Sequence, residues 1–87
     1  MFDNLACRVC GYIQDEPPWG EDGQCPNYII CACCGVEFGY GDCSLEAIKS
    51  SRKRWFSKGA NWKYPKEKPE NWSLEEHLKD IPLEYRE

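Results

Sequence analysis

Two stretches, CRVCG at residues 7–11 and CACCG at residues 31–35, decide how this chain folds. Each is a Cys-x-x-Cys-Gly turn, and 20 residues separate Cys10 from Cys31. The spacing lets both sulfurs of a turn face one point, and the glycine accepts a positive φ that turns backbone N–H groups toward the sulfurs. Four thiolates on two such turns can surround one metal ion as a tetrahedron. The pattern therefore predicts four metal ligands: Cys7, Cys10, Cys31 and Cys34.

The metal expected at this site is Zn²⁺, with iron as the alternative. A closed shell of four cysteines accepts either ion. A chain of 87 residues buries a limited core and gains from a structural metal. We therefore expect a zinc ion that stabilises the fold and leaves no open coordination position for catalysis.

Three of the seven cysteines are left over, namely Cys25, Cys33 and Cys43. We expect them to be buried, inert thiols, because their spacings match no known metal-binding pattern even with His77 included. Cys33 lies inside the second turn and could exchange with a neighbouring ligand. The single histidine, His77, is expected on the surface.

Cysteine usage and the first residues indicate a reducing compartment. The cysteine count is odd, and the opening MFDNLA has no basic region followed by an apolar run, so a secreted disulfide scaffold is not favoured. No stretch approaches the ~18 apolar residues of a membrane span. We expect a cytoplasmic protein with no membrane association.

Charge is divided into three blocks. Residues 1–48 carry eight acids and one base, residues 49–69 carry eight bases and one acid, and residues 70–87 carry six acids and two bases. The net charge of −4 hides this segregation, and a partner would meet the blocks rather than the mean.

The pattern predicts one domain, 1–87, in two parts: a four-cysteine knuckle module at 1–41 and a helical C-terminal extension at 42–87. Short apolar pieces beside each cysteine pair predict short β-strands. Asp42 or Ser44 can cap a helix that runs to about Lys58, where Gly59 stops it, and Ser73 begins a capping box for a shorter second helix. The spacing of Leu45, Ile48, Trp55 and Phe56 predicts that they share one face of the first helix. The expected fold class is a small α+β, metal-stabilised domain.

The two cysteine turns resemble those of rubredoxins and rubredoxin-like zinc ribbons, over roughly residues 5–38. Tyr12 after the first glycine and Asp15 soon afterwards match the first rubredoxin knuckle, whereas Ala32 stands where rubredoxins usually have proline. The resemblance implies a double-knuckle fold and either structural zinc or an iron electron carrier. The whole chain also resembles a group of small uncharacterised bacterial Cys-rich proteins, some of which lie beside polymorphic toxin genes.

A basic and aromatic segment at 52–64 raises a nucleic-acid alternative. Arg52, Arg54 and Lys58 would contact phosphates, and neighbouring rings would stack on bases. The acidic remainder of the chain makes this less favoured than a solvated basic face.

The favoured function is a non-enzymatic protein-interaction module, most specifically an immunity protein that binds and blocks a bacterial toxin domain. The sequence has no Ser-His-Asp set, no phosphate-binding glycine loop and no acid/base pair with a defined spacing. The acidic blocks suit a basic partner. The residues expected at the contact come from the loop between the knuckles and from the end of the module: Trp19, Glu21, Asp22 and Tyr40.

Overall fold

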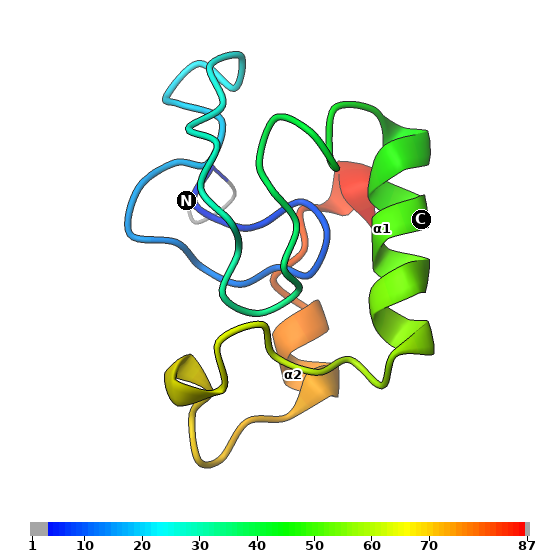
Figure 1. Ribbon diagram of the computed structural model, residues 1–87. Coiled ribbons are helices and arrows are strands. Elements are labelled where there is room, and N and C mark those ends of the chain that lie inside the picture. The colour runs from blue at the N-terminus through cyan, green and yellow to red at the C-terminus, as the bar shows by residue number, and fades with distance from the viewer. Residues whose placement is uncertain (1–3, 87) are drawn as a thin grey trace.

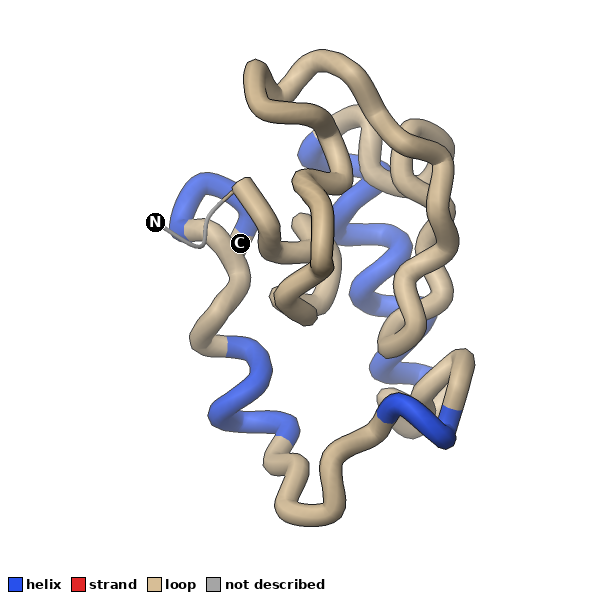
Figure 2. Tube along the Cα trace, turned by 90° about the vertical axis from the view of Figure 1, so that its left-hand side faces the viewer, coloured by secondary structure: helices blue, strands red, loops and turns tan. Residues whose placement is uncertain are grey.

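The computed structural model describes residues 4–86, and its helices all lie in the second half of the chain (Figure 1). Helix α1 spans Leu45–Ser57 and helix α2 spans Leu74–Leu78. Two 3₁₀ turns accompany them, η1 at Pro65–Glu67 and η2 at Leu83–Tyr85. Figure 2 shows the contrast between this helical half and the loops of the cysteine-rich half.

The expected α+β class is wrong, because residues 4–86 contain no β-strand and no sheet. Two isolated antiparallel bridges, Ala6 with Ile13 and Ile30 with Glu37, are the full extent of β pairing in that range. The segments on either side of each cysteine turn are too short and irregular to form a second bridge and so become β-strands. Tyr28 has a φ of 60°, which breaks the extended backbone just before Ile29.

Helix α1 begins and ends at the residues that the sequence indicated. The Ser44 side chain accepts a hydrogen bond from the backbone N–H of Ala47 at 3.1 Å, and Gly59 follows the helix with a φ of +91°. Its buried face consists of Ile48, Arg52 and Trp55. Leu45 and Phe56, also expected on that face, are exposed, so the face is narrower than predicted.

The core lies between α1 and the two cysteine turns. Its largest fully buried side chains include Phe38, Ile48 and Val9, together with the sulfurs of the turns. Trp55 and Trp62 close the core from the helical half. The helices formed by residues 4–86 are all too short or too polar to cross a bilayer.

Arg52 joins helix α1 to the first cysteine turn and to the C-terminal segment. Its Nε donates to the Val9 carbonyl at 2.6 Å, and its Nη2 donates to the carbonyls of Arg8, at 2.9 Å, and Tyr85. Three parts of the chain that are far apart in sequence therefore meet at one buried guanidinium. The arginine expected to contact nucleic acid is an internal structural residue, because its donors are directed to these carbonyls.

The C-terminal segment also packs closely on the first cysteine turn. A Cβ at Gly11 would lie 2.7 Å from the backbone nitrogen of Ile81 and 3.0 Å from the carbonyl oxygen of His77. Gly11 has a φ of +91°, so both its conformation and its surroundings require glycine. The second half of the chain thus rests against the turn that carries Cys7 and Cys10.

Replacing Gly11 by alanine should destabilise the protein more than the same change at Gly23. Both positions have positive φ, but a Cβ at Gly23 meets nothing within 4 Å. The two variants share the backbone penalty, and the difference of about 1–3 kcal/mol in the free energy of unfolding reports the clash with the C-terminal segment. Urea unfolding of the metal-loaded proteins measures it. Equal losses would contradict the packing described here.

Replacing Arg52 by methionine should lower the free energy of unfolding by about 2–5 kcal/mol. The variant keeps an apolar stem but leaves buried carbonyls without a donor. Arg54→Met on the exposed side of the same helix is the matched control, with an expected change within about 0.5 kcal/mol. Chemical denaturation of both variants tests this, and similar stabilities would exclude the structural role of Arg52.

Candidate metal centre

The two cysteine turns have the same backbone geometry. The N–H of Gly11 donates to the Cys7 carbonyl at 2.9 Å, and the N–H of Gly35 donates to the Cys31 carbonyl at 3.0 Å. The first cysteine of each turn also donates its N–H across the turn, Cys7 to Tyr12 at 2.9 Å and Cys31 to Val36 at 2.8 Å. Each glycine has the positive φ that such a turn needs. The repeat in sequence is therefore a repeat in structure.

The four sulfurs of these turns meet in one cluster. The Sγ atoms of Cys7 and Cys34 are 3.6 Å apart, and those of Cys10 and Cys31 are 3.7 Å apart. All four sulfurs lie within 4.8 Å of one another. A regular tetrahedron with metal–sulfur bonds of about 2.3 Å has edges of about 3.8 Å. Two sulfur–sulfur distances therefore match the edges of a tetrahedral Zn²⁺ or iron site, and all of them are within 4.8 Å.

Electrostatics within the cluster favour a bound cation. Burial raises the pKa of the Cys7 and Cys10 thiols, and hydrogen bonding with Cys10 raises the pKa of Cys34. Hydrogen bonding with Cys10 instead lowers the pKa of Cys31. Buried thiolates repel one another, so they must share protons unless a positive ion replaces those protons. A divalent ion would allow all four to be thiolates.

Donors and a positive charge surround the cluster. The backbone N–H of Tyr12 donates to the Cys10 sulfur at 3.5 Å, and Gln14 Nε2 donates to the Cys31 sulfur at 3.7 Å. Burial lowers the pKa of the Arg52 guanidinium, and the charges of three cysteine sulfurs oppose that shift. These groups compensate negative charge on sulfur. Sequence reasoning missed Gln14 and the charge role of Arg52, since neither follows from the cysteine spacing.

The leftover cysteines differ from the expectation of uniformly buried thiols. Cys33 is fully buried, but Cys25 and Cys43 are exposed. The Cys43 thiol donates to the Gly39 carbonyl at 2.8 Å, which leaves it at the surface beside the module. The expectation was wrong for these two, which lie in the loop between the turns and directly before helix α1.

Cys33 belongs to a second group of potential ligands with Cys10 and His77, whose ligand atoms lie within 4.8 Å of one another. A hydrogen bond with Cys10 lowers the pKa of Cys33 to about 7; burial opposes that shift, and the neighbouring His77 lowers it further. His77, expected on the surface, is half-buried among aromatic rings. The sequence pattern around His77 did not indicate that its side chain lies beside Cys10 and Cys33.

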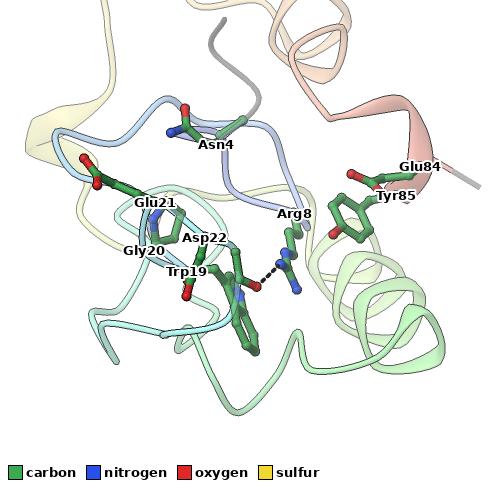
Figure 3. Close-up of a pocket in the computed structure, with 11 residues that line it drawn as sticks. Asn4, Arg8, Trp19, Gly20, Glu21, Asp22, Glu84 and Tyr85 are labelled. Atoms are coloured by element: carbon green, nitrogen blue, oxygen red, sulfur yellow. Dashed lines mark hydrogen bonds between the residues drawn. The ribbon is translucent and has the colours of Figure 1, made fainter.

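Of the four residues expected at a partner contact, three lie around one hollow and Tyr40 lies elsewhere. Trp19 donates its Nε1–H to Asp42 at 2.8 Å, and the Arg8 guanidinium lies 4.2 Å from the centroid of the Trp19 ring. These two contacts hold the Trp19 side chain in place. Trp19, Glu21 and Asp22 line one hollow of about 240 Å³ beside Arg8 (Figure 3). Tyr40 does not line that hollow and contacts Tyr28, with ring centroids 6.0 Å apart.

The fold and the site define a small, loop-rich protein in which a cluster of four cysteines can hold a metal ion. Two proteins of Bacillus subtilis (strain 168) are similar to this chain. Uncharacterized protein YozI is 34% identical, over 75% of this chain and 67% of its own length. Uncharacterized protein YoaQ is 33% identical, over 75% of this chain and 68% of its own length. The chain belongs to the family that includes YozI and YoaQ.

Broader comparisons give no further assignment. No family model matches the chain, and no solved structure matches it. Neither comparison supports the resemblance to rubredoxins and zinc ribbons. The geometry of the sulfur cluster shows that these cysteines can bind a metal ion.

Replacing Cys10 by serine should abolish stoichiometric metal binding and the cooperative unfolding transition. Structural zinc contributes on the order of 10 kcal/mol in small metal-dependent domains, so losing a ligand removes most of the stability. Cys25→Ser is the matched control, because Cys25 is exposed and lies outside both ligand groups. Metal content by mass spectrometry and far-UV circular dichroism report the two effects. Unchanged metal content in Cys10→Ser would show that the site is assigned to the wrong residues.

Proposed function

We propose that this protein is a non-enzymatic interaction module in which Zn²⁺, held by the four clustered cysteines, fixes a surface that binds a protein partner. The observation that carries the proposal is a group of exposed apolar side chains on the hairpin that forms the second cysteine turn. We call it the tyrosine–isoleucine patch, and it consists of Tyr28, Ile29, Ile30 and Tyr40.

The tyrosine–isoleucine patch is held by the same hairpin that carries Cys31 and Cys34. The Phe38 N–H donates to the Ile29 carbonyl at 3.1 Å, and Ile30 bridges to Glu37. Tyr28 and Tyr40 nevertheless expose 57% and 71% of their surface. The two tyrosine rings adjoin, with centroids 6.0 Å apart. Exposed apolar side chains of this kind are typical of a protein-binding surface, where aromatic residues supply much of the binding energy.

The charge of the module supports a basic partner. Four exposed acids lie in the segment between the turns: Asp15, Glu16, Glu21 and Asp22. An acidic surface steers a basic protein and speeds its association. The narrowest form of the proposal is an immunity protein that covers a basic toxin domain. Trp19, Glu21, Asp22 and Tyr40 remain the residues proposed for the contact, with the Trp19 side chain held in place by Asp42 and Arg8.

Two features favour this function over the alternatives. The sulfurs of Cys7, Cys10 and Cys31 belong to fully buried residues, which suits a structural ion better than an iron that must exchange electrons at the surface. The buried guanidinium of Arg52 is bonded to backbone carbonyls, so a nucleic-acid surface would lose a central cation.

A photo-crosslinking residue placed at Tyr40 in the native cells should yield a discrete covalent adduct with a basic protein. The matched control is the same residue at Leu83, which is 77% exposed but lies in the C-terminal segment. Ile29→Asp should weaken the adduct because it introduces a charge into the patch, and Cys10→Ser should abolish it with the metal. The adduct is read by mass spectrometry. No adduct from Tyr40, or the same adducts from Leu83, would contradict the proposed surface.

A further inference from the structure

His77 lies inside an aromatic cage next to the sulfur cluster. Its ring stacks on Tyr12 at 5.9 Å with an interplanar angle of 20°. The rings of Trp62 and Trp72 approach it edge-on at 5.8 and 5.6 Å. The imidazole comes from helix α2, which thereby contributes a titratable side chain next to the sulfur cluster.

The hydrogen bond from Trp72 determines where the imidazole carries its proton. Trp72 Nε1 donates to His77 Nδ1 at 3.0 Å. An indole N–H is a donor only, so Nδ1 must present its lone pair. In a neutral imidazole the hydrogen then lies on Nε2. Turning the ring over would place a C–H group against the indole donor and lose this bond.

The other ring nitrogen is available to the sulfurs. Nε2 of His77 is buried and has no hydrogen-bond partner among the described residues. A ring nitrogen of His77 lies within 4.8 Å of the sulfurs of Cys10 and Cys33. Since Nδ1 accepts the hydrogen bond from Trp72, Nε2 is the nitrogen that can interact with those sulfurs.

Two chemical uses of Nε2 must be distinguished. As a ligand of a second metal ion with Cys10 and Cys33, Nε2 would need its lone pair, and the ring hydrogen would move to Nδ1. Two N–H groups would then face each other across the 3.0 Å contact with Trp72. As a hydrogen-bond donor to sulfur, Nε2 keeps the hydrogen that the Trp72 bond assigns to it. The geometry favours the donor.

We propose that His77 is a positioning residue of the metal centre: in a tautomer held by Trp72, its Nε2–H faces the sulfurs of Cys10 and Cys33 and donates to them once the metal is bound. The proposal rests on the proposed metal-binding function. Four thiolates around a divalent ion leave a net charge of −2, and an N–H directed at sulfur stabilises that charge. Such outer donors also orient the ligand that they contact.

The tautomer can be measured directly, because His77 is the only histidine in the chain. Long-range ¹H–¹⁵N correlation spectra of the zinc-loaded protein should show Nε2 protonated and Nδ1 as an acceptor. Trp72→Phe keeps a ring in the cage but removes the donor, so the two tautomers should then be mixed. A protonated Nδ1 or a metal-bound nitrogen in the wild-type protein would overturn the proposal.

Cobalt(II) binding provides the second test, because its thiolate charge-transfer bands report the sulfurs. His77→Phe keeps the stacked ring, and should weaken Co²⁺ affinity by about 10- to 100-fold and shift those bands. His77→Gln retains an acceptor oxygen and an N–H donor in similar positions but is a poor ligand, and should restore affinity and spectrum toward wild type.

The outcomes separate this proposal from the proposed function. A wild-type chain that binds no metal would contradict the metal centre itself. One bound ion with an unaffected His77→Phe variant would contradict only the role of His77. A second equivalent of Co²⁺ that disappears equally in His77→Phe and His77→Gln would show that the imidazole is a ligand, and would also overturn the proposal.

Discussion

Convergence of four cysteine sulfurs on one point is the constraint around which this molecule is organised. The two turns share no sheet, and each has a single isolated bridge. Sulfur–sulfur distances of 3.6 and 3.7 Å bring the turns together at the spacing of a metal tetrahedron. Because buried thiolates repel, this convergence is stable only when protons or a cation neutralise them. The fold of the first half thus depends on the chemistry of its centre.

The helical half completes the environment of that centre. Helix α1 contributes Arg52, whose guanidinium bonds to the first turn and to the C-terminal segment while adding a positive charge near the sulfurs. Helix α2 contributes His77 inside its aromatic cage. The sulfur cluster is part of the hydrophobic core. Residues that pack in this core therefore also affect the charge on the thiolates. The exposed tyrosine–isoleucine patch lies on the hairpin that the centre fixes, which links metal binding to the proposed partner surface.

Local patterns predicted local structure well. Ser44 and Gly59 indicated the ends of α1, and Ser73 indicated the start of α2, because capping depends on neighbouring residues only. Prediction of strands was wrong, because apolar pieces beside the turns had no neighbouring strand with which to pair, and Tyr28 adopts a left-handed conformation. Exposure of Leu45 and Phe56, and of Cys25 and Cys43, was likewise not predictable from residue type, since it depends on what packs opposite.

The sequence by itself determined the repeated cysteine turns, because spacing and glycine positions act within five residues. It also determined the helix caps and the segregation of charge. Only the tertiary structure decided that Arg52 is internal, that Trp19 is engaged by Asp42 and Arg8, and that His77 lies beside Cys10 and Cys33. These contacts join residues more than 10 positions apart, and their partners are chosen by the packing of the whole chain rather than by any local pattern.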